Sequence, residues 1–332
     1  MERRPSSLEN MEKLKGKKIL VTGGTGFVGS HLVEELLTYG NSIVIPYRSR
    51  NPFSYFFDKN LDKKSILVHA DLREEKNIFE LLVKYEIEYV FHLAAQAIVP
   101  TAYYHPLDTF HINIMGTAYL LDAVRRCPYV RGVVVASSDK AYGKSKTVYK
   151  ENDALKGDHP YEVSKSCADL IATSYFKTYG VPVVTTRFGN IYGEGDLSFS
   201  RIIPGIMQTI LTRNPLEIRS DGTFTRQYLY VKDVVRGYVM LMEHIEKTKG
   251  EAFNFGSEED MSVLDLIYQI EKILKRKVPY VIKNQSINEI PNQLLDYAKI
   301  QTMLSWKPKY CLRSTVHGIL RWYTSYFRKT TI

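Results

Sequence analysis

A glycine-rich turn between a short apolar strand and an amphipathic helix is the feature that most constrains the fold of this chain. Residues 18–22 are apolar enough for a buried strand, and residues 29–39 carry apolar side chains at helical spacing. The alternation continues, with further strands expected at 42–46, 66–68, 89–93, 132–137 and 181–186 and further helices at 75–84, 108–126 and 161–179. Strands and helices alternating at these lengths predict an α/β protein with a doubly wound parallel sheet.

The turn itself places Gly23, Gly26 and Gly29 between the first strand and the first helix. A turn that brings backbone N–H groups against a pyrophosphate at a helix N-terminus has no room for side chains at such points. A glycine triplet at the first strand–helix junction therefore predicts dinucleotide binding. We expect a dinucleotide-binding domain over residues 17–188, joined by a strand near 252–255, after an N-terminal extension of residues 1–16.

The end of the second strand bears on which dinucleotide is bound. NAD-specific sites place a carboxylate there for the adenine ribose, whereas an Arg suits the 2′-phosphate of NADP. Residues 43–50 (IVIPYRSR) contain no carboxylate, and Arg48 and Arg50 stand at the expected place. The cofactor is thus predicted to be NAD(P), with NADP favoured, although an ordinary surface role for Arg48 stays open. Asp71, after the third strand, is expected either to accept from the adenine amine or to cap a loop.

Tyr161 and Lys165 lie four residues apart at the start of a predicted helix, so both side chains fall on one face. A tyrosine with an ordinary pKa of about 10 is a weak base at neutral pH, but a neighbouring ammonium and a nicotinamide cation favour its phenolate. Ser138 ends the strand at 132–137, where such sheets bind ligands. The three side chains form a set able to move a proton and a hydride at a sugar carbinol.

In this order and spacing the residues resemble the extended short-chain dehydrogenase/reductases, the family of NAD-dependent sugar-nucleotide epimerases and dehydratases. The resemblance spans nearly the whole chain, through the segments at 22–29, 92–96, 113–117, 187–193 and 305–308, where Ser305 replaces the glycine usual before the Trp. It implies a Rossmann-type domain, a smaller C-terminal α/β lobe at 189–332 that binds a sugar nucleotide, a tightly bound and recycled cofactor, and a homodimer packed through the helices near 108–126 and 161–179. Further cofactor contacts implied by the resemblance are Thr25, Phe27, Val28, Leu72, Leu93, Ala94 and Ala95.

The two residues after Ser138 bear on the reaction. Simple 4-epimerases of the family usually have small uncharged residues there, whereas this chain has Asp139 and Lys140. A 4,6-dehydratase needs an extra acid and base to remove the C5 proton and expel the C6 hydroxyl. The pair resembles that of CDP-glucose 4,6-dehydratase-like enzymes and implies Asp139 as the acid and Lys140 as the base. A GDP-mannose type of substrate, a 4-epimerase, and a structural role for the pair all stay open.

Fixed cations are expected for the substrate diphosphate, and Arg suits this role because its fork binds two oxygens. By resemblance, Arg226 is the phosphate-binding arginine, Arg201 a second candidate, and Gln96 and Asn190 are further substrate contacts. A surface ion pair or a loop-fixing hydrogen bond is the alternative for each of the arginines and for Asn190.

Composition narrows the remaining classes. The net charge of +9 over 332 residues is spread along the chain, which favours a basic surface over a nucleic-acid-binding arm. Three cysteines without metal-ligand or redox spacing favour a reducing compartment, and we expect no metal site. The charged N-terminus fits neither a signal peptide nor a membrane span, so a cytoplasmic location is expected. A non-catalytic dinucleotide-binding module would be expected to lack part of the Ser–Tyr–Lys set, which is complete here.

Overall fold

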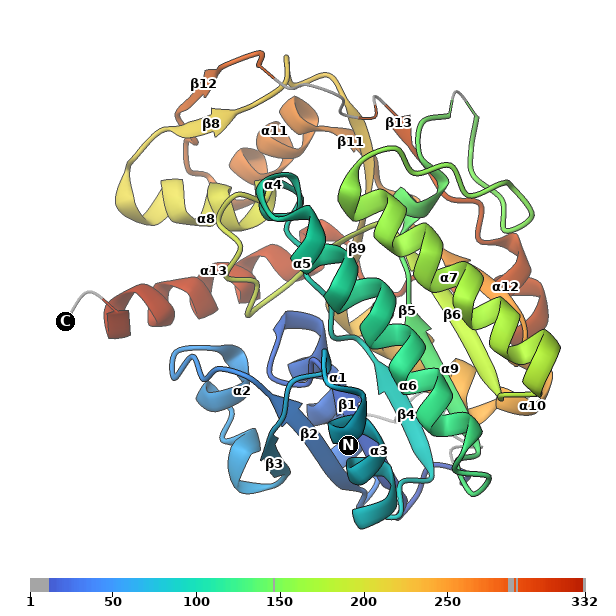
Figure 1. Cartoon of the computed structure of the whole chain (residues 1–332). Helices are drawn as coiled ribbons and strands as arrows, with labels where there is room; N and C mark the ends of the chain where they lie inside the picture. Colours follow the sequence, from blue (N-terminus) through green and yellow to red (C-terminus); the bar gives the residue numbers. More distant parts are fainter. Residues whose placement is uncertain (1–11, 146, 286–289, 291, 331–332) are drawn as a thin grey trace.

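A seven-stranded parallel sheet forms the centre of the structure, a computed structural model that describes residues 12–145, 147–285, 290 and 292–330 (Figure 1). Its strands follow the order β10-β6-β5-β4-β1-β2-β3, and every neighbouring pair is parallel. The strands are β1 (Lys18–Thr22), β2 (Ser42–Tyr47), β3 (Ile66–His69), β4 (Tyr89–His92), β5 (Gly132–Ala136), β6 (Val183–Phe188) and β10 (Ala252–Phe255). This sheet confirms the predicted doubly wound α/β fold.

Helices cover both faces of the sheet because successive strand residues point to opposite sides. On one face, Ile19 and Val21 of β1 belong to a buried apolar cluster that also contains side chains of several helices. On the other face, Leu20 belongs to a second such cluster with other helices. The first set includes α1 (Phe27–Leu37), α9 (Val231–Glu243) and α12 (Ala298–Leu304), and the second is α3 (Glu75–Lys84), α6 (Gly116–Arg125) and α7 (Pro160–Tyr179).

The helix expected over 108–126 is not a uniform α-helix. It consists of α5 (Pro106–Phe110), a π-helical turn η2 (His111–Met115) and then α6, after a short α4 (Val99–Tyr104). The wider turn places the buried Asn113 side chain against the loop after β4, where Asn113 Oδ1 accepts from Gln96 N at 2.8 Å and Nδ2 donates to Gln96 O at 3.0 Å. Such a π turn is often found at functional sites, and apolar periodicity does not reveal it.

The chain after β6 forms a smaller α/β part with its own apolar cluster. Its central strand β9 (Thr225–Tyr230) pairs with β7 (Asn190–Tyr192), β11 (Asp260–Ser262) and β13 (Asn292–Gln293), and β8 (Leu216–Ile218) pairs with β12 (Tyr280–Ile282). Its helices are α8 (Ile202–Thr212), α11 (Val263–Leu274) and α13 (Leu312–Thr330). The remaining short elements are α2 (Tyr55–Asp58), η1 (Leu61–Lys63), η3 (Asp139–Tyr142) and α10 (Ile245–Thr248).

The start of the described chain and the segment just before α13 are both fastened to the main sheet through α9. Leu14 is buried and its N–H donates to Glu243 Oε1 at 3.0 Å, so the expected extension over 1–16, most of which lies outside the described residues, ends in a fixed position. Trp306 is buried too, and its indole N–H donates to the carbonyl of Asp233 at 3.3 Å. The Asp233 carboxylate accepts from the N–H groups of Lys309 and Tyr310, which gives it a structural role.

Membrane-spanning helices and clusters of metal-binding side chains are both absent from the described residues. None of the described helices is both long enough and apolar enough to span a bilayer. The described His, Cys, Asp and Glu side chains form no group of three that is able to hold a metal ion.

Candidate active site

Two adjoining cavities open where the parallel strands end. The smaller, of about 570 Å³, is lined by the glycine turn and the ends of β2 and β3, and the larger, of about 700 Å³, is lined by residues from η3, α7 and the C-terminal part. They are two halves of one depression, because both are lined by Val28, Leu93, Ala95, Ala97, Asp196 and Arg201. Ligands of open parallel sheets bind in this position, beyond the carboxyl ends of the strands.

The glycine turn has the shape that a diphosphate requires. Gly23 has a φ of +70°, and a Cβ on Gly29 would lie 2.1 Å from the Gly23 carbonyl oxygen. Gly26 precedes the first turn of α1, which carries no acidic side chain and points its N–H groups toward the cavity. The residues present therefore fit a dinucleotide, with Thr25, Phe27, Val28, Leu93, Ala94 and Ala95 along the same wall.

The far end of the smaller cavity is basic. Arg48 and Arg73 line it with Asp71 and Leu72, whereas Arg50 is not among the lining residues and lies over the Tyr47 ring at 5.0 Å. The Asp71 carboxylate accepts from Arg73 Nη2 at 2.7 Å and from the Arg73 N–H at 2.9 Å, and these hydrogen bonds lower the pKa of Asp71. Asp71 thus holds Arg73 in a tight turn, which is the loop role that the sequence left open.

Ser138, Tyr161 and Lys165 come together at the wall of the larger cavity. His159 caps α7 by accepting from the Tyr161 N–H at 3.2 Å, which fixes the first turn of the helix and the start of the Tyr161 side chain. Burial raises the pKa of Tyr161, and the Arg201 charge and the Ser138 hydroxyl oppose that shift. Phenolate formation in the protein by itself is thus unfavourable, and a bound cation is needed to favour it.

Lys165 lies one helical turn after Tyr161 with its Nζ donating to the Ala136 carbonyl at 2.8 Å. Burial lowers the pKa of Lys165 to about 8. An ammonium that is buried and made easier to deprotonate is typical of groups that take part in proton movement.

Asp139 and Lys140 follow Ser138 in η3 and line the same cavity. The Ser138 hydroxyl donates to Asp139 Oδ1 at 2.9 Å, and Lys140 Nζ lies 3.7 Å from the same oxygen. Asp139 is only 1% exposed, and its Oδ2 has no hydrogen-bond partner among the described residues. A buried carboxylate oxygen without a hydrogen-bond partner is costly, so Asp139 Oδ2 is an unsatisfied polar atom of the site.

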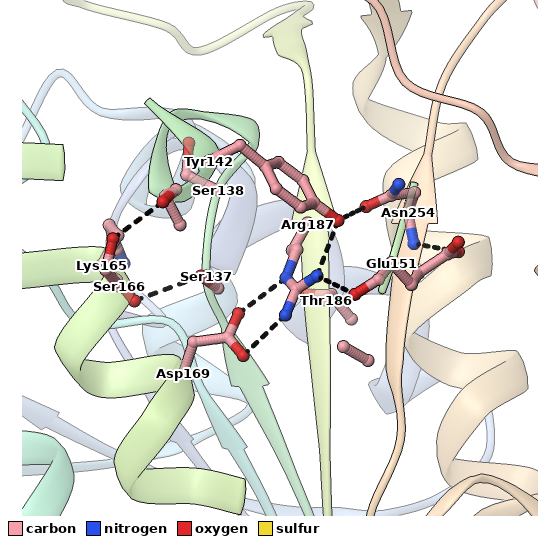
Figure 2. A network of polar contacts seen from close by, with 12 residues as sticks. Ser137, Ser138, Tyr142, Glu151, Lys165, Ser166, Asp169, Thr186, Arg187 and Asn254 are labelled. Atoms are coloured by element: carbon pink, nitrogen blue, oxygen red, sulfur yellow. Dashed lines mark hydrogen bonds and ion pairs between the residues drawn. The ribbon is translucent and has the colours of Figure 1, made fainter. Parts of the chain in front are cut away.

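A buried polar network behind η3 fixes the position of this short helix (Figure 2). Arg187 of β6 makes two hydrogen bonds to the Asp169 carboxylate of α7, at 2.8 and 2.9 Å, and donates to the Tyr142 hydroxyl at 2.6 Å. The Tyr142 hydroxyl in turn donates to Asn254 Oδ1 of β10 at 2.8 Å. The network joins η3, α7, β6 and β10, so the Asp139 and Tyr161 side chains are held in one frame.

The residues expected to hold the substrate fall into two groups. Asn190, Arg201 and Arg226 line the larger cavity, and Arg201 is also bound to Asp196 Oδ2 at 3.2 Å. Gln96 lines neither cavity: its Nε2 donates to Ile98 O and Thr109 Oγ1, both at 3.1 Å. The Gln96 side chain fixes the loop after β4, and its side-chain amide makes its hydrogen bonds within the chain.

Several residues of the site are absent from the sequence-based prediction. Arg187 and Asp169 carry a usable signal, since a charged residue inside the apolar strand 183–188 requires a buried partner. Arg73, two residues from Asp71, has a weaker signal. Gln293, whose Oε1 accepts from Lys140 Nζ at 3.2 Å, has none, because 153 positions separate the two residues.

Fold and site together define a Rossmann-type α/β protein with room for a dinucleotide beside a second ligand. The chain belongs to the NAD dependent epimerase/dehydratase family, whose model matches residues 19–256. It is 30% identical to a CDP-glucose 4,6-dehydratase of Salmonella typhimurium, over 95% of this chain and 92% of that protein.

Two solved structures are equally similar. One is UDP-glucuronic acid 4-epimerase from Bacillus cereus in complex with UDP-glucuronic acid and NAD, with a TM-score of 0.84, 26% identity and coverage of 93% of this chain and 99% of that one. The other is DesIV, a dTDP-glucose 4,6-dehydratase from Streptomyces venezuelae with NAD bound, with a TM-score of 0.84, 25% identity and coverage of 93% and 97%. The overall fold therefore does not separate epimerases from dehydratases.

Proposed function

We propose that this chain is an NAD(P)-dependent nucleotide-sugar 4,6-dehydratase, which converts an NDP-hexose of the CDP-glucose or GDP-mannose type into the NDP-4-keto-6-deoxyhexose. The observation that carries the proposal is the placement of Asp139 and Lys140 next to Ser138 in the cavity that Tyr161 also lines, with one Asp139 oxygen buried and unpaired. A 4-epimerase has no use for this additional acid and base.

Each side chain then has one task. When bound, the nicotinamide supplies the hydride acceptor for C4 and the hydride donor for C6. Tyr161, assisted by Ser138 and Lys165, removes the proton of the C4 hydroxyl. The resulting ketone acidifies C5, and Lys140, as the neutral amine, removes that proton while Asp139, as the carboxylic acid, protonates the C6 hydroxyl, which leaves as water. Lys140 then returns its proton to C5, and the proton held by Tyr161 is exchanged with solvent for the one that Asp139 gave up, so all three side chains end in their starting protonation states.

Arg201 and Arg226 are proposed to hold the substrate diphosphate, because both residues line the larger cavity. In the smaller cavity, the turn at Gly23, Gly26 and Gly29 is proposed to hold the cofactor diphosphate. NADP is favoured because Arg48 and Arg73 line the ribose end and no carboxylate ends β2. The similar solved structures hold NAD, so the mass of the cofactor released from the purified protein is the direct test.

A homodimer is proposed as the assembly. Large apolar side chains on the helices expected to pair are exposed, with Leu107 of α5 80% exposed and Leu170 of α7 58% exposed. Apolar surface of this kind on adjacent helices is typical of an interface between subunits. Light scattering on the purified protein tests this.

The test of the reaction is incubation with CDP-, GDP-, UDP- and dTDP-hexoses, followed by mass and by the absorbance of the 4-keto sugar in alkali. Loss of one water from one substrate supports the dehydratase and identifies its nucleotide. A product of unchanged mass and altered configuration at C4 would favour the alternative, a 4-epimerase, for which the similarity to the Bacillus cereus enzyme is the supporting observation.

A further inference from the structure

The Lys140 ammonium has two oxygen neighbours that come from different parts of the chain. Asp139 Oδ1, 3.7 Å from Nζ, belongs to the same short helix, whereas Gln293 Oε1, which accepts from Nζ at 3.2 Å, belongs to β13 of the C-terminal part. A lysine side chain has a flexible four-carbon stem, so its Nζ needs such contacts to keep one orientation. The hydrogen bond to Gln293 is the shorter of the two contacts and crosses between the two parts of the molecule.

Gln293 is itself buried within a paired strand. It is 3% exposed, and it lies opposite Arg226 in the parallel pairing of β13 with β9. Two residues later, the Leu295 N–H donates to Gln227 Oε1 at 2.9 Å. Leu295 also forms a β-bridge with Tyr149.

The bridge connects this segment back to η3. The Tyr149 ring stacks on the ring of Tyr142, with centroids 4.8 Å apart and planes 8° from parallel. Tyr142 is the last residue of η3, the helix that carries Lys140. The donor and the acceptor of the Lys140–Gln293 hydrogen bond are therefore fastened to each other independently of that bond.

The chemistry of the acceptor suits a base. A second carboxylate in place of the amide would favour the charged ammonium and oppose proton removal from C5, whereas an amide oxygen orients Nζ without adding charge. Gln293 Nε2 is buried and has no hydrogen-bond partner among the described residues. A buried unpaired donor is destabilising, so the amide is not explained by the stability of the fold.

We propose that Gln293 is a positioning residue, which orients Lys140 Nζ toward the substrate carbon for the elimination step. The inference rests on the proposed dehydratase function. It assigns to the C-terminal part a share in the elimination step, in addition to substrate binding, and it predicts that Gln293 has no part in the oxidation at C4.

The experiment uses the full-length protein and the NDP-hexose that the panel identifies. Gln293→Met removes the acceptor at similar volume, Gln293→Glu keeps an acceptor and adds a charge, and Lys140→Met serves as the reference for loss of the base. Asn292→Met is the matched control, because Asn292 is the exposed neighbour on the same strand. The absorbance of the reduced nicotinamide reports the oxidation at C4, and the mass of the product reports the loss of water.

We expect Gln293→Met to lower kcat for water loss by roughly 10-fold to 100-fold, because a misdirected base loses its alignment with the reacting atom. The KM, the rate of nicotinamide reduction and the behaviour of Asn292→Met should stay at wild-type values. Some reduced cofactor and NDP-4-ketohexose should accumulate, the latter lighter than the substrate by the two hydrogens lost in the oxidation and still holding its C6 hydroxyl.

Gln293→Glu should recover most of the water loss, with the acidic limb of its pH profile moved to higher pH because the added carboxylate favours the ammonium. The other titratable groups around the cavity are the same in the two proteins and include Asp139, Tyr149, Tyr161, Glu162, Lys165, Asp196, Arg201, Glu217, Arg219 and Arg226.

The outcomes separate the two proposals. If Lys140→Met stops water loss and Gln293→Met leaves it unchanged, the positioning role is wrong and the dehydratase stands. If Gln293→Met slows nicotinamide reduction as much as water loss, Gln293 has a general structural role and the inference also fails. If the Lys140→Met variant eliminates water at the wild-type rate, the role of Lys140 and the inference are wrong and the dehydratase stands. If no hexose loses water with the wild-type protein, the proposed function and the inference fail together.

Discussion

The glycine turn of the smaller cavity comes from one stretch, residues 23–29, whereas the Asp139 and Lys140 end of the larger cavity is assembled from η3, α7, β6, β10 and β13. The first needs only the local conformation of a strand–turn–helix unit. The second needs hydrogen bonds between residues more than a hundred positions apart. The cofactor end is therefore expected to tolerate changes in the rest of the fold, and the elimination end is expected to be sensitive to them.

The largest effect is expected where the two ends meet. Tyr161→Phe removes the phenol that takes the C4 proton, so nicotinamide reduction and water loss should both fall by about 10²- to 10⁴-fold, as is typical of a lost acid–base group. Stopped-flow absorbance measures the first step and mass the second.

Tyr179→Phe is the matched control, since Tyr179 is 56% exposed at the far end of the same helix. Wild-type rates of both nicotinamide reduction and water elimination in Tyr161→Phe would remove this residue from the mechanism. Slower water elimination with nicotinamide reduction intact would move Tyr161 from the shared step to the elimination end.

The next test concerns the frame of the elimination end. Arg187→Met leaves the buried Asp169 carboxylate unpaired, and breaking such a pair costs about 3–5 kcal/mol. Urea denaturation should show this loss. Arg125→Met is the control, because the Arg125 side chain is 40% exposed in its ion pair with Asp122 and such surface pairs contribute about 0–1 kcal/mol.

Equal losses in the two variants would mean that the Arg187 network adds no more than a surface ion pair. The comparison between the two ends of the site would then lose its energetic basis.

What the sequence could predict follows the same division. The strand and helix order, the glycine turn and the Ser138, Tyr161 and Lys165 set depend on short-range spacing, which periodicity and motif order report. Their placement along one depression is a geometric consequence of a parallel sheet. The contacts of Lys140 with Gln293, and of Arg187 with Tyr142, depend on tertiary packing, which leaves no periodic trace in one sequence. Gln96 is the opposite case: its motif predicted a substrate contact, but in the fold its side-chain amide is hydrogen-bonded to the loop after β4.

A third test uses pH and the protein without cofactor. Burial lowers the pKa of Lys165 to about 8, whereas a lysine in the unfolded chain has a pKa of about 10.4. Below pH 8 both states carry the proton, so the native protein bears the full cost of the buried charge. Above that pH the native state releases its proton first, so the unfolded state binds more protons and stability rises with pH.

Relative to Lys165→Met, wild-type stability should therefore rise by up to about 3 kcal/mol between pH 8 and the unfolded pKa of about 10.4. Denaturation of both proteins at a series of pH values measures the difference, and subtraction removes the contribution of the buried tyrosines. A difference that is flat over this range would mean that Lys165 is as easily charged in the fold as in water.

The smallest effect is expected at the cofactor end. Arg48→Ser should lower the preference for NADP over NAD about tenfold, because a charge-assisted hydrogen bond from an exposed guanidinium is partly screened by water. Fluorescence titration with both reduced cofactors measures the ratio. Arg50→Ser is the control, since the Arg50 guanidinium is engaged with Tyr47 and does not line the cavity. An unchanged NADP-to-NAD ratio in Arg48→Ser would show that the position of Arg48 at the end of β2 wrongly assigned it to the 2′-phosphate. Arg73, which is fixed by Asp71, would then be the remaining candidate at that end of the cavity.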